Sequence, residues 1–311
     1  LKIIKIYIML YMSDFLVSIF DKRDKPISES SRKLYQRNLE KLNDEKPVTS
    51  LGFLTDVSKI MQTISKYKPT TQRSFIISIC TVLKNNNEKL YQTYFEILSK
   101  MNSDLKVHVE KTEKQKDNWM GEDEITNIYS KLKKLVPKKI KSKEDYDAIL
   151  NFMIMSLYVL QAPRRNIDYT LMKISSEMSE KKYNYLDLNN KKFIFNNYKT
   201  QGTYLSTVVD VPDDLMRVIL MYVKVHPESK KLKNKKYNIH FLSTFYGENI
   251  EKSASMTNIL NKIFDKKIGS SMLRNMYLTN KYGSMMKEMK GDVKSMATSV
   301  DTAMNNYIKQ D

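Results

Sequence analysis

The sequence is poor in cysteine and histidine, the residues that most often form covalent cross-links or bind transition metals. Its 311 residues include one cysteine, Cys80, and three histidines. With one cysteine the chain can form no internal disulfide, which indicates a reducing compartment. His108, His226 and His240 stand far apart, without the spacing of metal ligands. We therefore expect no metal site, and we predict no cofactor.

The chain also lacks a long apolar run. Residues 1–12 are mostly apolar, but Lys2 and Lys5 interrupt them, the run is too short to cross a bilayer, and no small-residue cleavage site follows it. We expect neither membrane association nor secretion, so the sequence predicts an intracellular protein. Because the chain does not begin with methionine, we expect translation to start at Met9 or Met12.

Acidic residues are scarce relative to basic ones. Lysine and arginine number 53 against 35 aspartates and glutamates, which gives a formal net charge of +18. This excess favours a polyanion, and in particular nucleic acid, as the partner. A basic surface kept for solubility, or the composition bias of an AT-rich genome, would give the same excess. The length and a hydrophobic content of 41% predict a globular protein of two domains.

Residues 28–105 are predicted to form a helical domain, preceded by an N-terminal extension over residues 1–27. Apolar residues recur at helical spacing in four segments separated by turn-forming residues. The four predicted helices cover residues 28–42, 49–64, 72–83 and 89–101. Basic side chains lie between the apolar ones, and we expect them either to bind DNA phosphates or to form an ordinary solvated face. These side chains are Arg32, Arg37, Lys66, Lys68 and Arg73.

Residues 106–118 are strongly charged and lack an apolar period, so we interpret them as a linker to a second domain over residues 119–311. Strand-forming residues in three short segments predict a small antiparallel three-stranded sheet there. The segments cover residues 183–188, 192–196 and 205–211. The predicted helices of this domain cover residues 122–135, 142–160, 212–225, 254–264, 270–281 and 299–309. The predicted fold class is mainly α (α+β): a four-helix bundle followed by a helical domain with a small sheet.

Two arginines, a lysine and a tyrosine in the second domain suit a site that acts on phosphate. Arg165 follows Pro163 at a predicted helix start, and Lys199 lies in the predicted turn between two strands. Arg274 and Tyr307 lie in the last two predicted helices. This order resembles the C-terminal part of the tyrosine recombinase (phage integrase) family, in which His-x-x-Arg is followed by Gly-His-Ser-x-x-x-x-Thr-x-x-Tyr.

The resemblance covers residues 28–311 and includes the first arginine. Residues 162–169, Ala-Pro-Arg-Arg-Asn-Ile-Asp-Tyr, resemble the family's Gly-Leu-Arg-x-x-Glu motif. In relatives from large DNA viruses, virophages and related mobile elements, this motif has a Pro-Pro-Arg-Arg form. Arg165 fits better than Arg164, because Asp168 then stands three positions later, where the family has an acidic residue. We expect Arg164 to bind a DNA phosphate or to form a salt bridge.

The resemblance implies a site-specific recombinase or integrase that needs neither metal nor ATP. Arg165 and Arg274 would hold the non-bridging oxygens of the scissile phosphate, and Lys199 would protonate the leaving 5′-oxygen. Tyr307 would attack to form a 3′-phosphotyrosine. The implied partner is double-stranded DNA, bound by a dimer at one site and by a homo-tetramer on two duplexes. Integration of a viral or mobile element is the implied role, in a host nucleus, in the cytoplasm or in a virion.

Two positions depart from the family pattern. Ser271 stands where His-x-x-Arg has its histidine, and Thr298 stands where a second His or a Trp is expected. A hydroxyl group can donate a hydrogen bond but cannot act as a base near pH 7. Three alternatives therefore stay open: a type IB topoisomerase with the same four residues, a catalytically weakened DNA-binding relative, and a structural basic protein.

Overall fold

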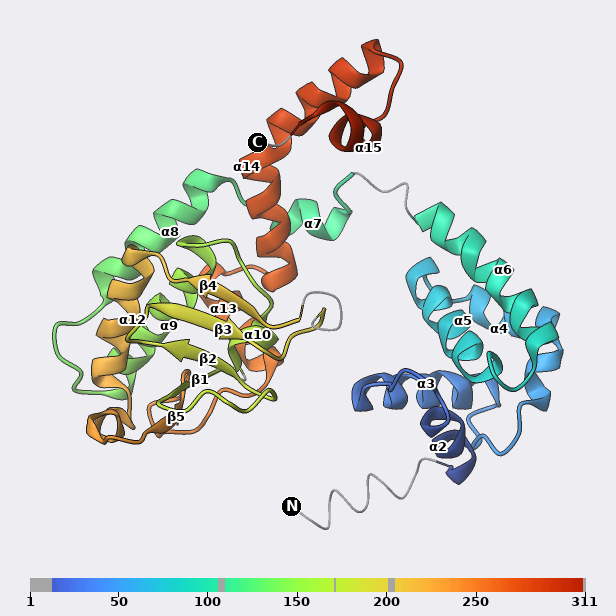
Figure 1. Cartoon of the computed structure of the whole chain (residues 1–311), viewed down its shortest axis with the longest axis horizontal. Helices are drawn as coiled ribbons and strands as arrows, with labels where there is room; N and C mark the ends of the chain where they lie inside the picture. Colours follow the sequence, from blue (N-terminus) through green and yellow to red (C-terminus); the bar gives the residue numbers. More distant parts are fainter. Residues whose placement is uncertain (1–12, 106–109, 171, 201–204, 310–311) are drawn as a thin grey trace. The chain divides into compact units, whose positions relative to one another are not determined.

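The protein is mainly helical, with one small mixed sheet (Figure 1). The residues that the structure, a computed structural model, describes are 13–105, 110–170, 172–200 and 205–309. Within these ranges no helix is long and apolar enough to cross a membrane. The chain divides into two compact units, residues 1–110 and residues 111–311.

The first unit is built around one central helix, α5. Its helices are α2 (Asp14–Asp21), α3 (Glu29–Leu42), α4 (Val57–Ser65), α5 (Pro69–Leu83) and α6 (Glu88–Leu105), with a 3-10 turn at Gly52–Thr55. The buried side chains of α5, among them Phe75 and Ile79, lie in one apolar core, and α5 contacts the four other helices. Ser13, Ser28 and Asp56 each accept a hydrogen bond from a backbone N–H in the first turn of α2, α3 and α4.

Helices α3 to α6 lie where the sequence predicts helices, whereas α2 lies within the expected extension over residues 1–27. Leu16, Ile19 and Phe20 of α2 are buried in the core around α5. Their spacing puts all three on one face of the helix. Residues 14–21 are therefore part of the first unit's core.

The five basic residues that we expect to bind DNA in this unit differ in how they are held. Arg32 pairs with Asp21 at 2.6 Å, and Nε of Arg73 donates to Oδ1 of Asn102 at 2.5 Å. The exposed members of the set are Arg37, Lys66 and Lys68. Two of the five are thus engaged inside the unit, and a role toward DNA stays a prediction for all of them.

The second unit is organised around α9, which is buried along most of its length. Its α-helices are α7 (Glu113–Asn118), α8 (Glu122–Leu135), α9 (Lys143–Val159), α10 (Asn166–Thr170), α12 (Asp213–Val225), α13 (Ser253–Phe264), α14 (Ser270–Ser295) and α15 (Val300–Thr302), with a 3-10 turn at Ser229–Lys233. A capping box between Ser142 and Asp145 begins α9. Its apolar side chains then pack against α8, α12 and α13.

The sheet of this unit is larger than predicted, and it is mixed. Its strands are β1 (Met172–Ser175), β2 (Asn184–Asp187), β3 (Lys192–Phe195), β4 (Thr207–Asp210) and β5 (Asn238–His240), in the order β4-β3-β2-β1-β5. Strands β2, β3 and β4 pair antiparallel as predicted, but β1 pairs parallel with β2 and antiparallel with β5. The prediction of three antiparallel strands was therefore wrong in number and in type. The four residues of β1 are all buried, so they show no alternation, and the three residues of β5 are too few to establish a period.

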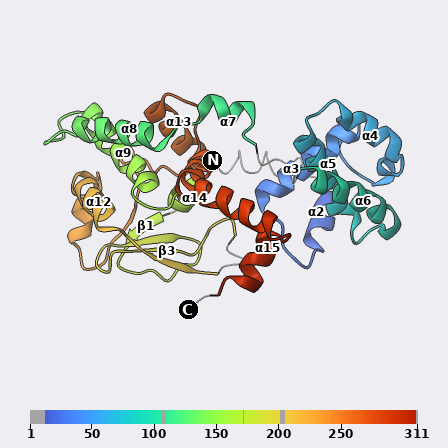
Figure 2. The same cartoon turned by 90° about the horizontal axis from the view of Figure 1, so that it is seen from above.

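The helices around α9 cover one face of the sheet. Figure 2 shows α8, α9 and α13 on the same side of β1 and β3. Leu186, Phe193 and Phe195 of the sheet belong to the same buried core as Met153 and Leu157 of α9. The β3–β4 edge and the end of α9 are thereby held close together, and the candidate site lies there.

The last long helix is longer than predicted. The sequence predicts a helix over residues 270–281, but α14 has 26 residues and continues to Ser295. No proline interrupts it. Gly283 is half-buried and Gly291 is exposed within it, and a glycine inside a helix costs about 1 kcal/mol, too little to end a helix. The helix predicted over residues 299–309 is replaced by α15 and a π-helical turn at Ala303–Tyr307.

Candidate active site

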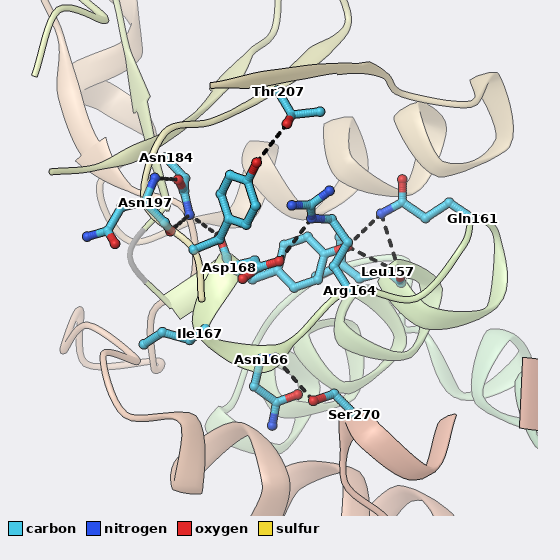
Figure 3. Close-up of polar contacts among 12 residues, drawn as sticks. Leu157, Gln161, Arg164, Asn166, Ile167, Asp168, Asn184, Asn197, Thr207 and Ser270 are labelled. Atoms are coloured by element: carbon cyan, nitrogen blue, oxygen red, sulfur yellow. Dashed lines mark hydrogen bonds and ion pairs between the residues drawn. The ribbon is translucent and has the colours of Figure 1, made fainter. Parts of the chain in front are cut away.

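The two adjacent arginines lie in the segment between the end of α9 and the start of α10. Asn166, the first residue of α10, is buried and fixes this segment (Figure 3). Its Oδ1 accepts from the Tyr158 hydroxyl at 2.6 Å, and its Nδ2 donates to Ser253 O at 3.1 Å and to Thr257 Oγ1 at 2.9 Å. Its backbone N–H donates to Ser270 Oγ at 3.2 Å. The start of α10 is therefore tied to α9, α13 and α14.

Arg164 is held between a buried carboxylate and two aromatic rings. Its Nε donates to Oδ2 of Asp168 at 2.9 Å, and its guanidinium lies 3.7 Å from the ring centroid of Phe195 and 5.2 Å from that of Tyr198. Asp168 is 2% exposed, and burial raises its pKa, against the opposing effect of the Arg164 charge. Arg164 thus neutralises Asp168 and joins α10 to the sheet.

The side chains of Arg165 and Arg274, by contrast, make no hydrogen bond or ion pair with any other residue that the structure describes. Both are partly exposed. Both line a pocket of about 630 Å³, also bordered by Arg164, Tyr198 and Asp210, which we name the arginine pocket. Two guanidinium groups that are free of protein partners can hold one phosphate by forked, charge-assisted hydrogen bonds.

A second pocket of about 610 Å³ shares Arg165 with the arginine pocket. We name it the lysine pocket, because Lys114 of α7, Lys199 of the β3–β4 connection and Lys267 of the α13–α14 loop line it. Ser271 also lines it. No aspartate or glutamate occurs among its described lining residues. Four basic side chains without an acidic one favour a phosphate-bearing ligand.

Part of the lining of the lysine pocket comes from residues that the sequence analysis assigns to the linker. Thr112 caps α7 through a capping box with Gln115, and both residues line the pocket. Helix α7 is attached to the α13–α14 loop, because Oδ1 of Asn118 accepts from the backbone N–H of Lys267 at 2.7 Å. The end of the predicted linker therefore contributes to the site.

Lys199 follows β3 and is exposed. The preceding residue, Tyr198, is buried, and its hydroxyl donates to Leu205 O at 2.7 Å and lies 3.0 Å from Thr207 Oγ1. These contacts join the two arms of the β3–β4 connection at its base. The turn predicted at Gln201 and Gly202 lies outside the described residues.

Tyr307 and Thr298 do not meet the other predicted site residues. Tyr307 is 61% exposed in the π-helical turn and lines neither pocket. The backbone N–H of Thr298 donates to Val293 O at 2.9 Å, just beyond the end of α14. At 1.5 Å per residue, the stretch of α14 from Arg274 to Ser295 is about 30 Å long. The segment with Thr298 and Tyr307 therefore begins at the far end of α14 from Arg274, and α15 lies back against α14 (Figure 1).

Sequence reasoning missed three residues that build the site: Asn166, Lys114 and Lys267. The two lysines stand in a lysine-rich chain, where no spacing distinguishes them. Asn166 directly follows the two arginines, but its role lies in contacts with α9, α13 and α14, which no local pattern contains.

Two of the three histidines have roles that need no metal. Nε2 of buried His226 lies 2.9 Å from Ser243 Oγ, its Nδ1 accepts from the backbone N–H of Glu228, and burial lowers its pKa to about 4. His240 pairs with Lys173 in the sheet. Across the described ranges, no group of three or more His, Cys, Asp and Glu side chains could hold a metal ion.

Comparison with known protein families gives no match, and comparison with curated proteins gives none either. Among solved structures, the crystal structure of XerA recombinase is similar to this chain, with 15% sequence identity and a TM-score of 0.35. The similarity covers 88% of this chain and 83% of that chain.

Proposed function

We propose that the protein breaks and rejoins DNA strands by the chemistry of tyrosine recombinases, through a 3′-phosphotyrosine. The observation that carries the proposal is the grouping of Arg165, Arg274 and Lys199 around two pockets that share Arg165. These are three of the four residues that the family resemblance assigns to catalysis. The net charge of +18 agrees with a DNA partner.

In this proposal the scissile phosphate binds beside Arg165, where the two pockets meet. Arg165 and Arg274 donate to its non-bridging oxygens and stabilise the charge of the pentacoordinate transition state. As the Tyr307 oxygen loses its proton to solvent water and forms its bond to phosphorus, the bond from phosphorus to the 5′-oxygen breaks, and Lys199 gives its proton to that oxygen. The phosphotyrosine keeps the energy of the phosphodiester, so rejoining needs no ATP.

Cleavage by Tyr307 requires the segment after α14 to take a new position. Tyr307 lines neither pocket, so residues 296–309 have to bring it to the arginine pocket of the same chain or of a second copy. Ser271, in the place of the family's histidine, lines the lysine pocket and can donate a hydrogen bond to a phosphate oxygen. Thr298 would move together with Tyr307.

The proposed architecture follows the same resemblance. Residues 28–105 would form the core-binding domain, residues 106–118 the linker and residues 119–311 the catalytic domain. The protein would bind one site as a dimer and join two duplexes as a homo-tetramer. We propose integration of a viral or mobile element as its role, inside a cell or virion.

Covalent trapping tests the proposal. The protein is incubated with nicked duplexes from which the cut fragment diffuses away, so that a DNA adduct accumulates. We expect an adduct with the wild type and none with Tyr307→Phe, at equal DNA binding. Because the target site is unknown, the duplexes come from a randomised pool. Absence of an adduct across the pool, with DNA binding intact, would contradict the proposal.

A DNA-binding relative without cleavage activity is the second candidate. The exposure of Tyr307 away from both pockets favours it. It predicts DNA binding without an adduct under any condition.

If adducts do form, supercoil relaxation by a monomer without strand exchange would identify the activity of a type IB topoisomerase. Exchange between two labelled duplexes would identify a recombinase.

A further inference from the structure

Asn184, the first residue of β2, has all its side-chain hydrogen-bonding capacity in use. It is fully buried. Its Oδ1 accepts from the backbone N–H groups of Asn196 and Asn197, both at 2.8 Å. Its Nδ2 donates to Asp168 O at 2.7 Å and to Asn197 O at 3.0 Å. A side-chain amide has two donors and one oxygen with two lone pairs, so these four bonds satisfy it completely.

The four bonds join the two parts of the chain that carry Arg165 and Lys199, and Figure 3 shows Asn184 with two of its partners, Asp168 and Asn197. Asp168 belongs to α10, three residues after Arg165, and its backbone N–H donates to Arg165 O at 3.0 Å. Asn197 lies two residues before Lys199. One buried amide therefore connects the helix that directly follows Arg165, the proposed phosphate-binding arginine, to the segment of Lys199, the proposed general acid.

Sheet pairing does not hold this segment. The pairing of β3 with β4 ends at Phe195 and Thr207, so Asn196 and Asn197 lie beyond it. Their side chains reinforce the attachment to the segment before β2, since their Nδ2 groups donate to Tyr183 O at 3.1 Å and to Lys182 O at 2.9 Å. The backbone N–H groups of both residues depend on Asn184.

We propose that Asn184 is a positioning residue that sets the place of Lys199 relative to Arg165. The inference rests on the proposed function. The leaving oxygen is protonated only if the lysine ammonium group comes within hydrogen-bonding distance while the arginines hold the phosphate. Misplacement of a catalytic group by about 1 Å can cost about 100-fold in rate. An exposed lysine on a short connection needs such a fixed base.

A substrate with sulfur at the 5′-bridging position tests this role. A thiol has a pKa of about 8.5, far below that of an alcohol, so the sulfur leaves as a thiolate without taking a proton from Lys199. Adduct formation is timed for the wild type, Asn184→Ala, Lys199→Ala and Arg274→Ala on 5′-oxygen and 5′-sulfur duplexes. We expect Asn184→Ala to slow cleavage about 10- to 100-fold on oxygen and much less on sulfur. Its sulfur-to-oxygen rate ratio then rises as in Lys199→Ala, whereas Arg274→Ala leaves the ratio near that of the wild type.

The ratio separates positioning from general damage to the fold, because partial unfolding slows both substrates equally. Asn190→Ala, in the turn at the other end of β2, is the matched control and should leave both rates unchanged. Hydrogen exchange gives a second readout without catalysis: the amides of Asn196 and Asn197 should lose protection in Asn184→Ala and keep it in Asn190→Ala.

Three outcomes would overturn the inference, and they differ from one another. An unchanged ratio in Asn184→Ala beside a raised ratio in Lys199→Ala removes the positioning role and leaves the proposed function standing. An unchanged ratio in Lys199→Ala removes the general acid and the inference with it. No adduct with the wild type on either substrate removes the proposed function itself.

Discussion

The phosphate-binding side of the candidate site and the segment that carries Tyr307 are held in very different ways. Around Arg165 and Lys199, the buried amides of Asn166 and Asn184 each make several hydrogen bonds between elements that are distant in the sequence. After α14, Met304, Tyr307 and Ile308 are 57%, 61% and 53% exposed. Ala303 is the buried residue of that segment.

Under the proposed function, this difference means that the phosphate-binding part of the site is preformed and that the nucleophile, Tyr307, is not yet in place. Preorganised donors stabilise a transition state without reorganising at the moment of reaction. A loosely held tyrosine slows the reaction instead, because its segment has to dock at the site before the tyrosine can cleave DNA. Under the proposed function, DNA is therefore bound before it can be cut.

Hydrogen exchange of the free protein tests this comparison most directly. The amides of Asn196 and Asn197 donate to a buried oxygen, whereas those of residues 304–307 lie in an exposed turn. We expect exchange at least about 1000-fold slower for the first pair, because local opening free energies range from near zero up to the global value. Equal protection would mean that the C-terminal segment is docked in solution, and the comparison would fail.

Arg274→Ala removes one of the two arginines proposed to hold the phosphate. Loss of one transition-state donor costs about 100- to 1000-fold in rate, so we expect adduct formation to slow by that factor at saturating DNA. Arg217→Ala is the matched control, because Arg217 is exposed, pairs with Asp214 and lines neither pocket. An equal loss in both variants would count against a catalytic role for Arg274.

Arg164 and Arg165 should differ in their effect on stability. Removing one partner of a buried ion pair costs about 3 kcal/mol or more, so Arg164→Gln should lower the free energy of unfolding by about 3 kcal/mol at neutral pH. Arg165→Gln should have little effect.

Burial raises the folded-state pKa of Asp168, so its contribution to stability is largest below its unfolded pKa and falls as the pH rises through the folded value. Without the Arg164 charge this pKa rises further, so the loss in Arg164→Gln should shrink as the pH falls from neutral toward the pKa of Asp168, as urea unfolding at a series of pH values will show.

The smallest expected effect is on the salt dependence of DNA binding, through Lys114 and Lys267 of the lysine pocket. Lys114→Ala and Lys267→Ala should each reduce the slope of log affinity against log salt by about 0.9, if each side chain neutralises one DNA phosphate. Lys116→Ala serves as control, because Lys116 pairs with Glu113 and does not line the pocket. Equal slopes for all three variants and the wild type would place the DNA elsewhere.

Local patterns in the sequence predict most of the helices and three of the five strands. Strands β2 to β4 follow one another with short connections, so their turns and their aromatic or β-branched residues mark them. Strands β1 and β5 gain their partners from distant parts of the chain, and β1 is buried throughout. No local pattern contains that pairing. The end of α14 was missed because glycine, which is often read as a helix end, destabilises a long helix only slightly.

The candidate site was predicted in part. The order of Arg165, Lys199, Arg274 and Tyr307 comes from family resemblance, and the structure groups the first three around adjoining pockets. The place of Tyr307 was not predictable, because it depends on the length of α14. Asn166 and Asn184 were missed because their role lies in contacts between elements, which a single sequence does not show.

Under the proposed function, the position of Arg165 on the shared wall of two pockets restricts the side from which Tyr307 can attack the phosphate. Attacking and leaving oxygens stand roughly in line across the phosphorus in phosphoryl transfer. With Lys199 in the lysine pocket, the leaving 5′-oxygen faces that side, so the tyrosine must arrive from the arginine pocket. The tyrosine oxygen would then attack from the arginine pocket, and the 5′-oxygen would leave toward the lysine pocket. The pocket that holds Lys199 would therefore set the strand polarity of the bound DNA.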